Sequence, residues 1–298
     1  MMTAARVEAS QIYYRSLLIL LVLTWAISWP VIKVGVSSVS PIWFGCLRYI
    51  IAACCLFGFV AVRGELALPP RSDWPLVVVS GALQLGAYSA LTGLALTTLP
   101  PGRASVLAFS TSIWVVPLAA WWLHERVSRR ALLGVALGLL GVLAIAAPSL
   151  HLDEKAQILA YAMLMAAAAA WAISIVFVRQ HRFSATALAL APWQMLVAAT
   201  LLLPLAFAAE GPLLLVGVKG MAALAYVGPV ATAFAYWAVV EAGRRFPAST
   251  MSMALLATPS LGILISALTL GETIGISLIA GVTLIGAGIR LATTTRHA

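Results

Sequence analysis

The chain has 298 residues, of which 63% are hydrophobic and only 9% are charged, and its mean hydropathy is +1.04. This composition leaves too little polar surface to solvate a globular domain, so a lipid bilayer is the expected solvent. The formal net charge is +9, but the Lys and Arg residues are scattered between apolar runs, which argues against nucleic-acid binding and favours contact with anionic lipid headgroups.

A polar segment opens the chain and carries Arg6 and Arg15, as the first part of a secretory signal peptide does. The apolar run that follows is long and lacks a small-x-small cleavage site. This segment is therefore expected to lead into a retained first membrane helix.

Ten apolar stretches separated by short polar breaks follow along the chain. Because a transmembrane helix takes about 20 residues, ten spans use the available length, and residues 1–298 are expected to form a single all-α membrane domain. The shortest breaks lie at Pro100-Pro101 and around Glu272, where the prolines and the glutamate favour helix ends. The predicted spans are 17–36, 42–63, 74–98, 103–123, 131–147, 157–178, 186–208, 221–242, 249–270 and 274–292.

Positive charge is concentrated at one end of these spans. If the N-terminus is cytoplasmic, thirteen of the eighteen Lys and Arg residues fall on the inner side and four on the outer side, while Arg48 lies inside the second span. Cytoplasmic loops of membrane proteins carry an excess of Lys and Arg. This asymmetry supports ten spans and predicts that both termini are cytoplasmic.

Several short patterns recur at a nearly constant offset. Trp25–Ser28 recurs as Trp171–Ser174, 146 residues later, and Pro101 maps onto Pro247 at the same offset. At an offset of 147, Glu125, Gly134, Leu137 and Gly141 correspond to Glu272, Gly281, Leu284 and Gly288. Because a repeat of five spans is odd, the second half is expected to be inverted relative to the first. Inverted repeats are typical of secondary transporters, whose site lies between the halves near the bilayer midplane.

These residues resemble the EamA branch of the drug/metabolite transporter superfamily. The resemblance is carried by Trp25–Ser28, by Pro41 through Arg48-Tyr49, by Gly93 through Ser128 and by Val240 through Gly275. It implies ten helices, with residues 17–147 and 157–292 as two inverted EamA-type repeats, and export of small metabolites. Within the family the chain is similar to the aromatic amino acid exporter group. It departs from internal symmetry in two ways: Gln194 stands where the first half has Arg48, and Pro117 and Pro259 do not align.

Candidate substrate-binding residues lie in the middle of the spans. Trp25 is about 12 Å from the inner end of its span at the helical rise, with Ser28 on the same helix face, and Trp171 and Ser174 repeat the arrangement. They are interpreted either as cavity walls or as core packing in which each serine bonds its own backbone.

Two further spans carry polar stripes that should not face lipid. In the third span Gln84, Tyr88 and Thr92 recur every four residues, and in the eighth Thr232 and Tyr236 repeat the spacing beside Trp237. The two interpretations are helix-to-helix hydrogen bonding and a cavity lining that offers hydroxyls and aromatic faces to a small zwitterion. The candidate binding residues are Trp25, Ser28, Gln84, Tyr88, Thr92, Trp171, Ser174, Tyr236 and Trp237.

The charged residues of the spans are interpreted mainly as structural. Arg48 either snorkels to the outer interface or binds a carboxylate. Glu125 and Glu272 precede the fifth and tenth helices, where a carboxylate stabilises a helix N-terminus, and Glu241 is placed to pair with Arg244. The glycines of the fifth and tenth spans, including Gly286 and Gly288, are expected to let these helices approach closely.

The sequence lacks the residues that other functional classes of membrane protein require. All four histidines and both aspartates fall in or beside loops, which disfavours a membrane enzyme, and no metal site or cofactor is expected. A phosphate-binding loop for ATP and a channel filter motif are not visible. The best hypothesis is a secondary transporter in a bacterial inner membrane that exports amphipathic amino acids by alternating access, with export of drugs or nucleosides as the alternative. Two five-helix halves can complete a monomer.

Overall fold

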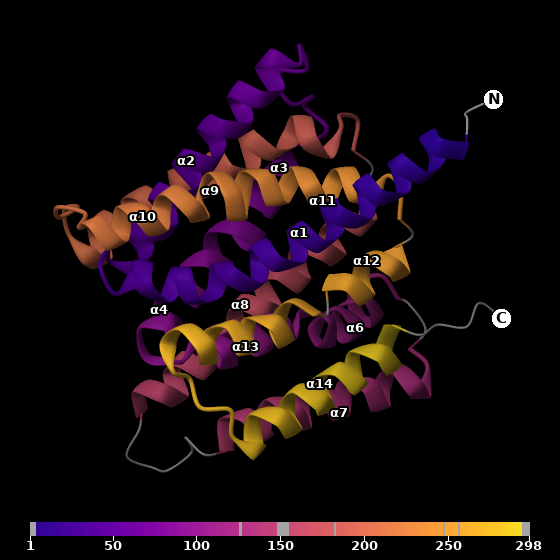
Figure 1. Ribbon diagram of the computed structural model, residues 1–298, viewed down its shortest axis with the longest axis vertical. Helices are drawn as coiled ribbons and strands as arrows, with labels where there is room; N and C mark the ends of the chain where they lie inside the picture. Colours follow the sequence, from indigo (N-terminus) through magenta and orange to yellow (C-terminus); the bar gives the residue numbers. More distant parts are fainter. Residues whose placement is uncertain are drawn as a thin grey trace.

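The computed structural model describes residues 4–124, 127–147, 155–181, 183–246, 248–255 and 257–293, and within these ranges the chain is helical without strands. The helices lie roughly parallel or antiparallel to one another in a single bundle (Figure 1). They are α1 (Ala4–Val36), α2 (Pro41–Val62), α3 (Trp74–Val79), η1 (Ser80–Ala87), α4 (Tyr88–Thr98), α5 (Pro101–Ala108), α6 (Thr111–Trp122), α7 (Arg129–Ala146), α8 (Lys155–Gln180), α9 (Ala187–Glu210), α10 (Val218–Val227), η3 (Pro229–Phe234), α11 (Ala235–Gly243), α12 (Ala248–Leu255), α13 (Ala257–Leu270) and α14 (Ile276–Thr293).

Helices occupy all ten of the predicted stretches. Eight stretches are long and apolar enough to cross a membrane, and two shorter apolar helices, Ala257–Leu270 and Ile276–Leu291, fall in the predicted ninth and tenth spans. The third and eighth stretches each contain a π-helical segment, η1 and η3, which the sequence patterns do not predict. The first helix begins at Ala4, well before the predicted span.

Helices from the first and second halves of the chain pack against each other in opposite directions. The start of α2 meets the end of α9, where the amides of Ile42 and Trp43 donate hydrogen bonds of 3.0 Å to the two carboxylate oxygens of Glu210. At the other end of the pair, the Phe57 and Trp193 rings lie 5.0 Å apart. α7 and α14 are antiparallel as well, as their glycine contacts show.

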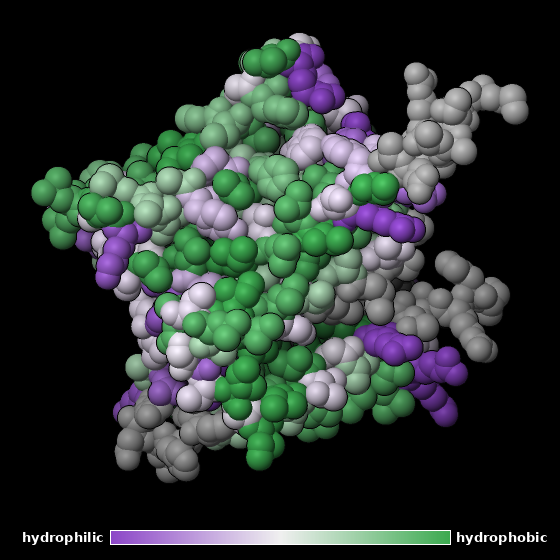
Figure 2. Space-filling model, in the orientation of Figure 1, coloured by the Kyte–Doolittle hydropathy of each residue, from purple (hydrophilic) through white to green (hydrophobic). Residues whose placement is uncertain are grey.

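Apolar side chains cover the outside of the bundle. Exposed leucines such as Leu132, Leu139 and Leu143 on α7 face outward, while several serine and threonine side chains in the helices, Ser28 and Ser174 among them, are buried. Figure 2 shows green apolar side chains over most of the visible face and purple polar groups near the helix ends. The start of α1 and the end of α14 lie at the same end of the bundle (Figure 1). A surface of this kind suits the hydrocarbon core of a bilayer.

Glycine brings α7 and α14 into close contact. A methyl group at Gly288 would lie 2.5 Å from the carbonyl oxygen of Gly134 and 2.8 Å from the amide nitrogen of Gly138. At Gly286, two residues earlier, no atom lies within 4 Å of such a methyl group. Gly288 therefore acts as the sequence predicts, whereas the prediction for Gly286 is wrong because that residue faces away from the contact.

Gly288→Ala should destabilise the bundle, because the methyl group meets backbone atoms that cannot rotate away. We expect a loss of about 1–3 kcal/mol, measured as a lower thermal midpoint in detergent. Gly286→Ala on the same helix is the matched control and should leave the midpoint unchanged or slightly raised. Equal midpoints for the two variants would show that the α7–α14 contact does not depend on glycine.

Candidate functional site

Two π-helical segments lie in the middle of the bundle, where regular helix gives way in the third and eighth stretches. Each has a carbonyl oxygen that accepts a hydrogen bond from an aromatic side chain of another helix. The Tyr49 hydroxyl of α2 donates to Leu85 O in η1 at 3.1 Å, and the Trp25 indole of α1 donates to Ala231 O in η3 at 3.2 Å. Pro229 contributes to the irregularity of η3 because proline has no amide N–H to donate. π-Helical segments are frequent at functional sites.

Polar side chains meet beside η3. Arg48 Nε donates to the Thr232 hydroxyl at 2.7 Å, and that hydroxyl donates to Val227 O. One turn further along, the Tyr236 hydroxyl donates to the Gln194 side-chain oxygen at 3.0 Å. Gln194 lies 146 residues after Arg48, at the offset of the sequence repeat. The two side chains contact the same helical stretch, Arg48 from α2 and Gln194 from α9.

Aromatic and polar side chains also join α8 to the third stretch. The Tyr88 and Trp171 rings lie 4.6 Å apart in an edge-to-face arrangement with an interplanar angle of 84°. The Ser174 hydroxyl, one turn along α8 from Trp171, lies 3.3 Å from the Gln84 side-chain oxygen and 3.5 Å from the Ser80 hydroxyl. Tyr88, Trp171 and Gln84 remain only partly buried. Their side chains therefore retain surface that a small molecule could contact.

The remaining candidates from the sequence have different surroundings. The Ser28 hydroxyl donates to Trp25 O and the Thr92 hydroxyl to Tyr88 O, both within their own helices. Trp237 lies with Phe59 and Phe234 in an apolar groove of about 300 Å³ beside α2. Tyr49 and Gln194 belong to the central group although they were not candidates. The sequence did offer a signal for each of them. Tyr49 directly follows Arg48 inside the second span, and Gln194 stands at the repeat offset from Arg48.

A second hollow, of about 540 Å³, opens at one end of the bundle beside the α4–α5 and α13–α14 connections. Lys33, Arg103 and Glu272 are among the residues that line it. The Lys33 amine donates to three carbonyls at the end of α4, those of Leu96, Thr97 and Leu99. A cation at this position stabilises the C-terminus of the helix.

Glu272 caps a helix of the other half of the chain. Its carboxylate accepts hydrogen bonds from the amides of Gly102 at 2.7 Å and Arg103 at 3.2 Å, at the start of α5. The sequence predicts that Glu272 caps the helix that follows it, the tenth. This prediction is wrong, because the helix that Glu272 caps is α5. The left-handed turn at Gly271, with φ of 67°, and the non-helical residues after it bring the carboxylate to α5. Glu125 and Pro247, the repeat equivalents of Glu272 and Pro101, lie outside the described residues.

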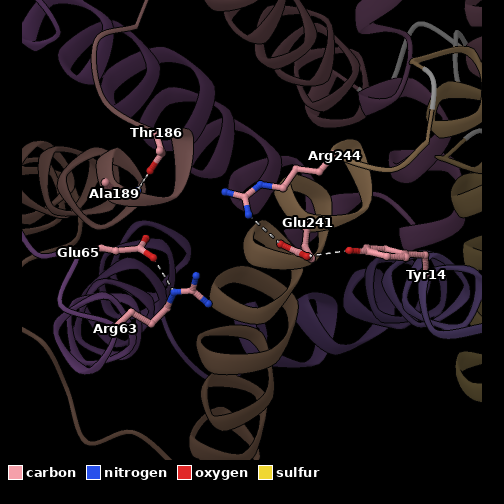
Figure 3. A network of polar contacts seen from close by, with 7 residues as sticks. All are labelled: Tyr14, Arg63, Glu65, Thr186, Ala189, Glu241 and Arg244. Carbon is pink, nitrogen blue, oxygen red and sulfur yellow. Dashed lines mark hydrogen bonds and ion pairs between the residues drawn. The ribbon is translucent and has the colours of Figure 1, made fainter. Parts of the chain in front are cut away.

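The opposite end of the bundle holds another set of polar contacts (Figure 3). Glu241 of α11 accepts a hydrogen bond of 3.2 Å from the Tyr14 hydroxyl and pairs with Arg244 at 3.5 Å, which confirms the predicted Glu241–Arg244 pair. In the same view Arg63 pairs with Glu65 at 2.9 Å.

Asp73 joins the start of α3 to the segment before α9. Its carboxylate accepts hydrogen bonds from the amides of Ser184 and Ala185 at 2.9–3.0 Å. Burial of this side chain acts to raise its pKa, but these bonds, together with those of the neighbouring hydroxyls, outweigh burial and hold the pKa below its ordinary value. Asp73 is therefore ionised at neutral pH and acts as a structural link.

One protein family matches the chain along most of its length. The model of the EamA-like transporter family matches residues 14–147 and again residues 158–294. A relative from Salmonella typhimurium, named probable amino-acid metabolite efflux pump, is 27% identical over 287 residues, which cover 92% of each chain. The probable terminal-alkyne amino-acid exporter of Streptantibioticus cattleyicolor is 27% identical over 261 residues, or 86% of this chain and 84% of that one.

Two other proteins extend the comparison. The uncharacterized transporter YoaV of Bacillus subtilis is 26% identical over 275 residues, which cover 92% of this chain and 94% of that one. A crystal structure with 23% sequence identity superposes with a TM-score of 0.62 over 93% of this chain and 96% of that one. The likeness to this structure shows a shared fold.

The protonation of Glu272 should make stability depend on pH. Burial raises the pKa of this carboxyl above its ordinary value of about 4.3, and the bonds from Gly102 and Arg103 reverse only part of the rise. The folded state thus binds the proton more tightly than the unfolded state does. The contribution of Glu272 to the free energy of unfolding is fully present below the pKa that its carboxyl has in the unfolded chain. It is lost as pH rises through the higher pKa of the folded state.

Glu272→Gln, which stays neutral, removes this dependence. The thermal midpoint of the unmodified protein minus that of the variant should therefore decrease as pH rises from the ordinary carboxyl pKa of about 4.3 through the raised pKa of the folded state. Arg63→Gln, which removes a surface ion pair instead, is the control for general effects of charge. A difference that stays constant or grows with pH would contradict the assignment.

Proposed function

The chain belongs to the EamA-like transporter family, and from that membership we propose that it exports amphipathic and aromatic amino acids from a bacterial cell. Two of its relatives bear names that refer to amino-acid export. The observation that carries the proposal is the group of aromatic and polar side chains in the middle of the bundle, around Tyr88, Trp171, Tyr236 and Gln194. Aromatic faces suit the side chain and the ammonium group of such a substrate.

The proposed architecture is a pair of inverted five-helix repeats, residues 17–147 and 157–292. It is supported by the family model, which matches twice, and by the antiparallel packing of α2 on α9 and of α7 on α14. The recurrence of a π-helical segment in the third and eighth stretches also supports it. Two related packings of such halves would expose the central group alternately to each side of the inner membrane.

The proposed orientation places both termini in the cytoplasm. The distribution of Lys and Arg favours it, and α1 begins at the same end of the bundle as α14 ends (Figure 1). The hollow lined by Lys33 and Glu272 is then on the outer side, and the Glu241 contacts are on the inner side.

A transport panel in proteoliposomes tests the function. Purified protein should carry aromatic and other amphipathic amino acids and should not carry nucleosides or cationic drugs at comparable rates. Flux of nucleosides or drugs without amino-acid flux would overturn the proposal and favour the alternative class of exporter.

Removal of the central aromatic pair should impair transport. Trp171→Ala and Tyr88→Ala should each lower amino-acid flux about three- to tenfold, since an aromatic pair is worth about 0.5–1.5 kcal/mol beyond its buried area. Trp121→Ala removes a tryptophan that is 74% exposed and should leave flux unchanged. If both central variants retained full flux, these residues would be packing groups.

Export should not require a proton gradient. The acidic side chains that the structure describes, Glu65, Asp73, Glu210, Glu241 and Glu272, lie at helix ends or in connections, whereas proton relays use acids within the membrane. Amino-acid flux down a concentration gradient should therefore proceed at equal internal and external pH. Flux that stops without an imposed pH gradient would contradict this.

A further inference from the structure

Arg48 is a cation inside the membrane domain. It lies seven residues after the start of α2, or about 10 Å along the helix. Within the described ranges no carboxylate pairs with it; its polar partners are the Thr232 hydroxyl and the face of the Tyr49 ring, whose centroid is 5.3 Å from the guanidinium carbon. A charge at this depth is costly, and intramembrane cations that are retained usually serve a function.

The side chain points toward the middle of the bundle. Its partner Thr232 lies fourteen residues after the start of α10, near the midpoint of the 218–243 stretch. Snorkelling would instead carry the guanidinium toward the start of α2 at Pro41, the nearer helix end, where headgroups lie. The bond from Nε to Thr232 therefore favours a role inside the protein.

The terminal nitrogens of Arg48 are available to a ligand. Neither Nη atom donates a hydrogen bond to a residue in the described part of the chain, and neither is among the fully buried polar atoms without a partner. The side chain is correspondingly only partly buried. A guanidinium fork held through Nε presents two parallel N–H groups, which match the two oxygens of a carboxylate.

Arg48 has no charged equivalent in the second half. Gln194 occupies the corresponding position, 146 residues later, and its side-chain oxygen already accepts the Tyr236 hydroxyl. The central group is therefore electrically asymmetric, with its positive charge on the α2 side. A zwitterion would bind in one orientation, with its negative end toward α2.

We propose that Arg48 binds the carboxylate of the transported molecule and so restricts transport to substrates that carry one. This inference rests on the proposed export of amino acids. Arg48 lies against the Tyr49 ring, and the Tyr49 hydroxyl donates to Leu85 O, three residues before Tyr88, the partner of Trp171. A carboxylate held at Arg48 would thus place the rest of an amphipathic amino acid among aromatic side chains.

The test compares phenylalanine with phenylalanine amide and phenethylamine, both of which lack the carboxylate and keep the ammonium group. The unmodified protein should transport phenylalanine at least tenfold better than either analogue, because a hydrogen-bonded charge pair is worth about one to two powers of ten in affinity. Arg48→Gln, which copies the residue of the second half, should abolish this preference by raising the phenylalanine concentration needed for half-maximal flux. Arg48→Lys should restore part of it.

The outcomes separate this inference from the proposed function. Amino-acid transport in which the analogues move as well as phenylalanine, or in which Arg48→Gln keeps the preference for the carboxylate, would overturn the role of Arg48 and leave amino-acid export intact. An equal loss of flux for all three compounds in both Arg48 variants would show a structural role and overturn the inference as well. Failure of the unmodified protein to carry any amino acid would overturn the proposed function itself.

Discussion

The hydrocarbon core of a bilayer offers no hydrogen-bond partners, so every backbone group within it must be satisfied by the protein. Regular helices meet this demand along most of the chain. Where the helices become irregular, other helices supply the partners: Tyr49 binds Leu85 O in η1, and Trp25 binds Ala231 O in η3. These bonds tie α2 to the third stretch and α1 to the eighth. The most irregular backbone of the bundle is thus also where helices distant in sequence are joined.

The same constraint concentrates polar side chains in the interior. Two side chains contact the stretch formed by η3 and α11. Arg48 of α2 donates to Thr232, and Gln194 of α9 accepts a hydrogen bond from Tyr236. Leucine and other apolar residues occupy most of the outward-facing positions. A molecule that enters the bundle therefore meets hydroxyl, amide, aromatic and guanidinium groups together. In the proposed alternating access, rearranging two packed halves around this group would expose it to one side of the membrane and then the other without rebuilding it.

Hydropathy, charge and repeat spacing predicted the ten helical stretches, because a bilayer imposes length and composition on every span. The predicted bounds agree within a few residues except for the first helix, which begins at Ala4 rather than at residue 17. The π-helical segments could not be predicted in this way, since apolar periodicity does not show the bonds that their carbonyls accept from Tyr49 and Trp25 on distant helices. The sequence patterns also could not show which helix Glu272 caps, because the turn at Gly271 directs its carboxylate to α5. Local periodicity likewise placed Trp237 among the central residues without showing which neighbours it has.

Access to the middle of the bundle from both sides is what the proposed mechanism requires. It can be measured with Gln84→Cys in a background in which Cys46, Cys54 and Cys55 are replaced, by labelling reconstituted protein of known orientation with a membrane-impermeant thiol reagent. Leu139→Cys, on the lipid-facing side of α7, is the control that should not react. Alternating access predicts labelling of position 84 from either side of the membrane, with substrate changing the ratio. Labelling from one side alone, with or without substrate, would contradict it.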